Sequence, residues 1–106
     1  MEGFLTKRER IIRVLMDADR PLTVEEIADR LGLDRSEAKG LYEELAHASR
    51  TLNRATQGRM VIAMVPPRCL SCGYVFKDVK RPRRPSRCPK CKSERISRPM
   101  FTIIKV

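Results

Sequence analysis

The sequence predicts an α+β fold in which three helices are followed by a two-stranded hairpin that carries a small metal-binding insertion. Three observations lead to this prediction. The first half of the chain contains helix-start signals, each followed by apolar residues at helical spacing. Two strand-like apolar runs lie in the second half. All the cysteines of the chain, arranged in two close pairs, lie between those runs.

The helices are predicted from capping boxes, in which a threonine or aspartate precedes a glutamate by three positions. The boxes are Thr6…Glu9, Thr23…Glu26 and Asp34…Glu37. The apolar residues that follow them predict helices near residues 7–18, 24–31 and 35–53. Pro21 ends the first run, and the stretch from Arg20 to Leu22 can add a short strand.

The second and third helices have the spacing of a helix-turn-helix. Ala28 is small enough to let two helices approach closely, and Gly32 supplies the left-handed residue that the turn needs. Ala38 and Leu41 then seat the following helix on the preceding one. We interpret this pattern as a DNA-binding motif whose third helix is the reader, with an ordinary three-helix bundle as the alternative.

The candidate reading surface is the face of the third helix opposite Leu41 and Leu45. At one hundred degrees per residue, this face carries Ser36, Lys39, Glu43, His47 and Arg50. Lys39 suits a guanine, and Ser36 suits a base or a phosphate. Glu43 can accept from cytosine but otherwise repels the DNA backbone, so the predicted reading helix is not strongly basic. The single histidine is interpreted as a surface residue.

The two apolar runs near residues 59–65 and 101–106 are predicted to pair as antiparallel strands. Neither run has a partner in its own neighbourhood, and pairing also gives the helices a sheet to pack on. The result is a winged helix-turn-helix domain, residues 1–67 plus 99–106, with a zinc ribbon, residues 68–98, inserted in the wing hairpin. Two separate domains in series, with a frayed C-terminus, are the alternative.

The metal site is predicted from Cys69-Leu-Ser-Cys72 and Cys88-Pro-Lys-Cys91, two C-x-x-C pairs separated by fifteen residues. Four thiolates at this spacing predict one tetrahedral Zn²⁺ per chain, with Cys69, Cys72, Cys88 and Cys91 as ligands. Because no coordination position is left for water, the expected role is structural. The insertion has few large apolar residues, so metal binding and local folding should be one event. Disulfides or unlinked thiols are the alternatives.

Charge is divided unevenly along the chain. Residues 1–57 carry ten Lys/Arg and eleven Asp/Glu, whereas residues 58–106 carry thirteen and two. Tetrathiolate zinc lowers the net charge of the second half from +11 to about +9. This asymmetry indicates a polyanionic partner, double-stranded DNA. A solvated charged surface in a thermophilic protein is the alternative, although that habitat alone predicts mixed charge.

A basic loop from Lys77 to Arg87 joins the two cysteine pairs and holds six basic residues. Pro82 and Pro85 favour an extended loop, whose arginines suit phosphates or a narrow minor groove. The predicted DNA contacts from this half are Arg59, Lys80, Arg81, Arg83, Arg84 and Arg87. A solvated loop that keeps the protein soluble is the alternative.

The segments Cys72-Gly73-Tyr74-Val75-Phe76 and Cys88-Pro89-x-Cys91 resemble the two metal knuckles of rubredoxin. With Ala28, Gly32 and the flanking strands, they make nearly the whole chain similar to one family. This family is the archaeal predicted transcriptional regulators that join a winged helix-turn-helix to a rubredoxin-like zinc ribbon. The resemblance implies zinc in the ribbon and DNA as the ligand, but it supplies no target sequence.

Two other functions are kept as alternatives. Archaeal transcription factor E is similar in pairing a winged helix with a zinc ribbon and acts mainly through RNA polymerase. An accessory factor that binds RNA polymerase or another transcription factor is therefore the first alternative, for which the acidic residues Glu25, Glu26, Asp29 and Glu43 leave room. A rubredoxin-like iron electron carrier is the second, although rubredoxins are acidic and this ribbon is basic.

No enzymatic activity is expected, because the chain offers no nucleophile–base pairing around its single histidine and no phosphate-binding glycine loop. The absence of a signal peptide and of a long apolar run predicts a cytoplasmic protein without a membrane partner. No long amphipathic dimerisation helix is evident, so a monomer or a weak homodimer is expected.

Overall fold

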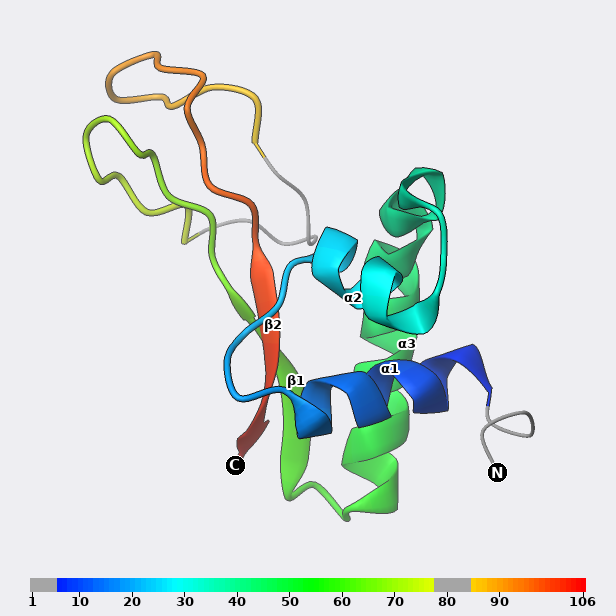
Figure 1. Ribbon diagram of the computed structural model, residues 1–106. Coiled ribbons are helices and arrows are strands. Elements are labelled where there is room, and N and C mark those ends of the chain that lie inside the picture. The colour runs from blue at the N-terminus through cyan, green and yellow to red at the C-terminus, as the bar shows by residue number, and fades with distance from the viewer. Residues whose placement is uncertain (1–5, 78–84) are drawn as a thin grey trace.

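A computed structural model describes residues 6–77 and 85–106, which form three α-helices, one 3₁₀ helix and a two-stranded sheet. The helices lie to one side of the hairpin, and the cysteine-containing ribbon extends from the end where β1 stops and β2 starts (Figure 1). The predicted α+β arrangement, in which a hairpin after three helices carries the ribbon, is confirmed. Within the described residues, no helix combines the length and the apolar character needed to span a membrane.

The first two helices, α1 (Lys7–Asp17) and α2 (Val24–Leu31), begin at the predicted capping boxes. The hydroxyl oxygen of Thr6 accepts a hydrogen bond from the Glu9 N–H at 3.2 Å, and that of Thr23 accepts one from the Glu26 N–H at 3.2 Å. Each glutamate reaches back to its threonine, so two backbone donors at each helix start are satisfied. The short strand expected near Leu22 is reduced to a single bridge with Phe101.

The prediction of one α-helix over residues 35–53 is wrong at its start. Residues Arg35–Gly40 form a 3₁₀ helix, η2, and α3 runs over Leu41–Ala55. Gly40 joins the two elements, and glycine favours the α-helix less than almost any other residue. Ala38 of η2 is buried in the core cluster that also contains residues of α2 and α3. The predicted DNA contacts Ser36 and Lys39 therefore lie on η2 rather than on an α-helix.

The hairpin pairs β1 (Met60–Val65) with β2 (Met100–Lys105) in antiparallel register, from Met60 opposite Lys105 to Val65 opposite Met100. Side chains of α3 cover the outer edge of β1. The Ser49 hydroxyl oxygen accepts from the Ile62 N–H at 3.1 Å, and the Thr56 hydroxyl oxygen accepts from the Met60 N–H at 3.1 Å. The edge of β1 is therefore partly satisfied within the chain.

The core lies between the helices and one face of the hairpin. Its buried members are Ile11, Leu15, Leu22, Val24, Ile27, Ala28, Leu31, Ala38, Leu41, Leu45, Ala48 and Phe101. Phe101 is the contribution of β2: it is 2% exposed, its ring lies 6.2 Å from that of Tyr42, and its backbone pairs with Leu22 in both directions. Through this residue, the strand that returns from the ribbon is fixed to the helices.

Two glycines of the helix-turn-helix provide a matched pair of predictions. Gly32 has a φ of +74° at the end of α2, whereas Gly40 has a φ of −69°, and a Cβ at either position would meet nothing within 4 Å. We expect Gly32→Ala to lower the free energy of unfolding by about 1–2 kcal/mol, because alanine is strained in the left-handed region. Gly40→Ala should raise it by about 0.5–1 kcal/mol. Denaturant unfolding measures both, and equal effects of the two variants would contradict the assigned turn.

Candidate functional site: a four-cysteine metal centre and a helix-turn-helix surface

The two cysteine pairs lie on two knuckles with matching backbone structure. In the first, the Gly73 N–H donates to the Cys69 carbonyl at 2.9 Å, and in the second the Lys92 N–H donates to the Cys88 carbonyl at 2.9 Å. Gly73 and Lys92 both have positive φ, +82° and +64°. This backbone turn aims nearby N–H groups at the sulfurs, as when the Lys90 N–H lies 3.4 Å from the Cys88 sulfur.

The four sulfurs form one compact cluster. All of them lie within 4.8 Å of one another, with Cys69 Sγ 3.5 Å from Cys91 Sγ and Cys72 Sγ 3.6 Å from Cys88 Sγ. A disulfide would bring sulfurs to about 2.05 Å, so these contacts are not disulfides. Zinc bound to four thiolates at about 2.3 Å places them about 3.8 Å apart, the edge of a regular tetrahedron. The cluster has the size and donor set of a tetrathiolate zinc site.

Backbone amides lower the pKa values of cysteine thiols in this cluster, whereas repulsion between neighbouring sulfurs raises that of Cys91. Burial raises the pKa of Cys69, but hydrogen bonds from the amides of Cys72 and Ser71 outweigh it and bring this pKa to about 6. The Ser93 amide lowers the pKa of Cys91, yet the neighbouring sulfurs raise it to about 12. The first thiolates therefore form easily, and the last one needs a cation among the sulfurs. A divalent cation supplies that charge and is expected to displace the remaining protons.

A small apolar cluster supports the metal centre. It consists of the buried Cys69, Cys88 and Ile96, against which Tyr74 and Phe76 pack. The two aromatic rings meet edge to face at a centroid distance of 5.1 Å. In the described residues, the segments 74–76 and 94–97 make only isolated bridges, Arg68 to Val75 and Cys69 to Ile96. Among the residues that the structure describes, regular strand pairing is therefore limited to the β1–β2 hairpin.

The ribbon contacts the helical part through an ion pair. Arg98, which leads from the ribbon into β2, places Nη1 3.4 Å from Oε1 of Glu25 on α2. That carboxylate oxygen is buried and makes no well-formed hydrogen bond in the described part of the chain. The pair therefore joins the base of the ribbon to the first helix of the helix-turn-helix.

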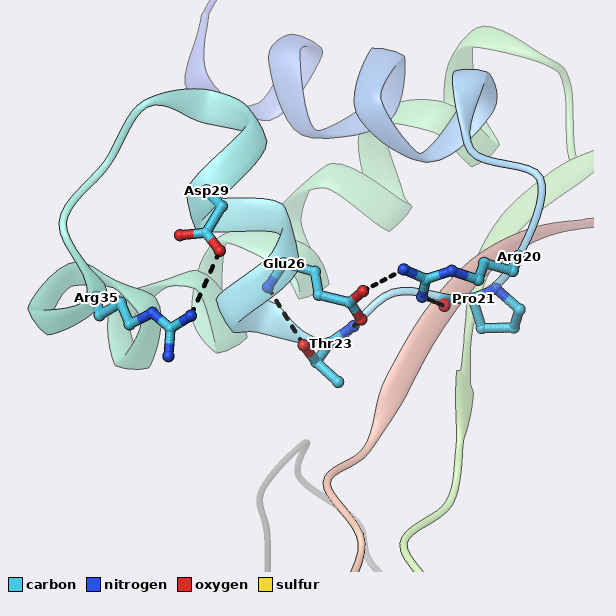
Figure 2. Close-up of polar contacts among 6 residues, drawn as sticks. All are labelled: Arg20, Pro21, Thr23, Glu26, Asp29 and Arg35. Carbon is cyan, nitrogen blue, oxygen red and sulfur yellow. Dashed lines mark hydrogen bonds and ion pairs between the residues drawn. The ribbon is translucent and has the colours of Figure 1, made fainter.

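The other two carboxylates of α2 are also paired with arginines (Figure 2). Glu26 bonds to the guanidinium of Arg20 from the preceding loop, and Asp29 lies 3.6 Å from Arg35 on η2. Figure 2 shows Glu26 between Arg20 and Thr23, so one side chain both caps the helix and binds the loop. The negative charge of α2 is thus balanced within the chain.

Glu26 gives the fold a predicted acid dependence. Its hydrogen bonds from Arg20 and from the Thr23 N–H hold the pKa of this carboxyl at about 2, below the ordinary 4.5. Because the folded pKa lies below the unfolded one, the stabilisation is complete above about pH 4.5 and is lost as pH falls towards 2. We expect Glu26→Gln to cost about 1 kcal/mol at pH 7, since the pair is partly solvated, and to flatten the loss between pH 4.5 and 2. Denaturant unfolding of the Glu26→Gln variant and the unmodified protein across this pH range measures the difference. Parallel stability profiles for the two would contradict the role assigned to Glu26.

The predicted DNA contacts fall in three places. On the helices, Ser36, Lys39, Glu43 and Arg50 are exposed and His47 is half-buried. The Arg50 Nη2 lies 2.6 Å from His47 Nδ1, one turn away on α3. Arg59 precedes β1 at the end of the hairpin remote from the ribbon, and Arg87 is exposed next to Cys88 on the ribbon (Figure 1). The other predicted contacts, Lys80, Arg81, Arg83 and Arg84, lie outside the described residues.

Two features of the structure were not predicted from the sequence. Arg54 is exposed one turn after Arg50, and both line a groove of about 390 Å³ between α3 and Val61 of β1. The spacing of four residues between the two arginines was a usable sequence signal. The pairing of Glu25 with Arg98 had no such signal, because it depends on how the returning strand meets α2.

The fold and the cysteine cluster define the class as a small α+β protein in which a two-stranded hairpin after three helices carries a rubredoxin-like zinc ribbon. Residues 6–61 match the family model described as PF0610-like, N-terminal, and residues 66–105 match the PF0610 rubredoxin-like zinc beta-ribbon domain. The chain therefore belongs to the PF0610-like family. The second description specifies zinc, and the predicted cofactor is confirmed.

A solved structure of similar architecture is the solution NMR structure of protein PF0610 from the archaeon Pyrococcus furiosus. The two chains are 29% identical, the match covers 96% of this chain and 94% of that one, and the TM-score is 0.64. No curated protein matches the sequence. The predicted joining of a helical domain to a rubredoxin-like zinc ribbon is thus found in a family, whose descriptions specify neither DNA nor transcription.

Proposed function

We propose that this protein is a transcriptional regulator that binds double-stranded DNA. In this proposal η2 and α3 read the major groove, and the zinc ribbon contacts the DNA backbone or the minor groove. The observation that carries the proposal is the distribution of unpaired charge. The carboxylates of α2 are balanced by arginines of the same chain, whereas the cations in the described part of the ribbon, Arg98 apart, make no ion pair there.

In the described part of the ribbon, all charged residues but one are cations. The exposed cations without an ion pair are Arg68, Lys77, Arg87, Lys90, Lys92 and Arg95, and Arg98 is exposed but paired with Glu25. Glu94 is the one acidic residue of residues 68–77 and 85–98, and within these ranges no carboxylate lies within 4 Å of a cation of that set. A tetrathiolate zinc site removes about two positive charges and leaves the ribbon strongly positive. Such a surface suits phosphates, which would release condensed counterions on binding.

The ion pairs also bear on the alternative of a factor that binds mainly protein through acidic helices. That alternative depended in part on the acidic residues of α2. Each of them has an arginine partner in the structure: Glu25, Glu26 and Asp29. Glu43 stays exposed, so one carboxylate remains on the reading surface. Balanced carboxylates on α2 repel DNA less than free ones would, which favours the nucleic-acid proposal over this alternative.

An electron-transfer role is disfavoured by the metal, because zinc does not change its oxidation state in proteins. Colour separates the two cases directly: an iron tetrathiolate is red, whereas the zinc protein is colourless. A red protein as purified, with iron rather than zinc by metal analysis, would contradict the proposed function.

Selection of bound duplexes from a random pool, at two salt concentrations and with zinc content measured alongside, tests the proposal. A recovered consensus would support a sequence-specific regulator. Salt-sensitive binding without a consensus would limit the role to an architectural one. No duplex binding together with tight binding to RNA polymerase would replace the proposal with the accessory-factor alternative.

The basic loop gives a quantitative prediction. If about five phosphates are neutralised, the logarithm of the association constant should fall with the logarithm of salt concentration with a slope near −4.5. Replacing Arg81, Arg83 and Arg84 by alanine should flatten this slope by roughly 2–3 units. The double variant Lys7→Ala/Arg13→Ala, on α1, is the control and should change it by less than about one unit. Fluorescence anisotropy on a random-sequence duplex measures the slopes, and equal slopes for all three proteins would reject the loop as a contact.

A further inference from the structure

One face of the hairpin has no partner within the described chain. Alternate residues of a strand point to opposite faces, and Ile62, Met64 and Ile103 pack against the core together with Phe101. The residues between them therefore point away from the helices. By register they form three cross-strand pairs, Val61 with Ile104, Ala63 with Thr102, and Val65 with Met100, which we call the outer sheet face.

The outer sheet face is mostly apolar and joins no core cluster of residues 6–77 and 85–106. Five of its six side chains are apolar, and none belongs to either apolar cluster of the described residues. Ile104 is 44% exposed, and the other five are partly exposed. In Figure 1 the helices lie to one side of the hairpin. An antiparallel sheet with one solvated face usually carries polar residues there, so this pattern indicates a surface that becomes covered.

The backbone of β1 directs a partner to this face rather than to the edge of the strand. Ser49 and Thr56 already accept from the N–H groups of Ile62 and Met60, and the Asn53 amide lies 3.4 Å from the Met60 carbonyl oxygen. An added strand along β1 would have to break these contacts. Packing against the pleated side chains requires no such change.

Cations frame the outer sheet face. Arg59 and Lys105 lie at one end, and Arg68 lies at the end nearest the ribbon, where Arg98 is already paired with Glu25. Arg50 and Arg54 line the groove beside Val61. No aspartate or glutamate occurs in residues 59–68 or 98–106. The chemistry that complements this surface is an apolar stripe flanked by carboxylates.

We propose that the outer sheet face docks an acidic amphipathic segment of a partner protein. Apolar side chains of the segment pack on Val61, Val65 and Ile104, and its carboxylates face Arg50 and Arg54. A second copy of this chain would bring the same cations together and is disfavoured by repulsion. A membrane surface favours protruding bulky side chains, whereas Ile104 is 44% exposed here and the other five side chains are less exposed. DNA offers no matching apolar stripe.

The experiment is selection of peptides from a random displayed library against the zinc-loaded protein, followed by affinity measurement with purified variants. Selected peptides are expected to combine Asp/Glu with large apolar residues. Ile104→Glu should weaken their binding at least tenfold, and so should Arg50→Glu/Arg54→Glu. Peptides in which lysine replaces glutamate should bind the Arg50→Glu/Arg54→Glu protein. Met16→Glu, on an exposed apolar residue of α1, is the matched control and should change nothing. Thermal unfolding establishes that each variant is folded.

Several outcomes would overturn the proposal. These are failure to select any peptide, selected peptides without net negative charge, or undiminished binding to Ile104→Glu. Sedimentation that shows a dimer lost in Ile104→Glu would assign the face to a second copy. Binding to phosphatidylserine vesicles that is lost in the same variant would assign it to a membrane. Duplex binding is measured on Ile104→Glu in parallel and should be unchanged, so failure of the proposed DNA function and failure of this proposal are distinguishable.

Discussion

Removal of zinc by a chelator is expected to unfold the described ribbon segments, residues 68–77 and 85–98, while the helices stay folded. Structural zinc sites contribute about 10–16 kcal/mol of apparent binding free energy. Without it, the ribbon has only the small cluster of Ile96, Tyr74 and Phe76 around its cysteines, which buries too little surface to offset chain entropy. The helical core has its own twelve buried residues and does not include the metal.

Amide hydrogen exchange followed by NMR measures this difference residue by residue. Chelation should abolish protection at the Cys69 and Cys88 amides, which donate to the Tyr74 and Ser93 carbonyls, and preserve it in α3. Cys88→Ser should reproduce the effect in the presence of zinc, whereas Ser86→Ala, at a neighbouring exposed position, should not. Unchanged protection of the ribbon after complete zinc removal would show that the ribbon folds by other means.

The second large effect is expected at Phe101, where the returning strand meets the core. Phe101→Ala should lower the free energy of unfolding by about 3–5 kcal/mol, because it removes a buried ring and leaves a cavity against Tyr42 and Leu22. The helical part and the ribbon should then lose their fixed relation, since the anchor of β2 is gone. Denaturant unfolding of the zinc-loaded protein measures the loss.

Ile104 is the matched control for this prediction because it lies on the same strand and points to the opposite face. Ile104→Ala should cost less than about 1 kcal/mol, as its side chain is 44% exposed. Similar losses for the two alanine variants would contradict the assignment of inner and outer faces. A large loss of stability in Ile104→Ala but not in Phe101→Ala would reverse the assignment of the two faces.

The parts of the fold that depend on local chemistry were predictable from the sequence. The bounds of α2 follow from Thr23, Glu26 and Gly32, which start and end the helix through contacts with near neighbours. The hairpin was predictable for a different reason: two apolar runs far apart in the sequence each lacked a local partner, and the structure pairs them. In both cases the requirement, a capped helix or a partner for an unpaired strand, can be met by few arrangements of the chain.

The parts that were not predictable depend on the three-dimensional arrangement. The apolar spacing of residues 35–53 is compatible with an α-helix throughout, and it does not indicate the tighter winding of Arg35–Gly40. The partner of Glu25 is Arg98, which approaches only because β2 returns beside α2. Lys92 takes the left-handed conformation that glycine takes in the other knuckle, and its residue type gives no indication of this.

The metal centre was the most predictable part of the site. Cysteine spacing, thiolate chemistry and the closure of a tetrahedron leave little freedom, and the prediction of one zinc held by four cysteines is confirmed. The DNA surface stays a prediction, because contacts to bases depend on how η2 and α3 enter a groove. The exposure of Lys39 and Arg50 is compatible with such contacts.

The most direct measurement of the central claim is cadmium-113 NMR on protein in which cadmium replaces zinc. We predict a single cadmium resonance per chain, with scalar coupling to the β-protons of Cys69, Cys72, Cys88 and Cys91. Coupling to fewer than four of these cysteines, or two separate resonances, would contradict a single tetrathiolate site that folds the ribbon.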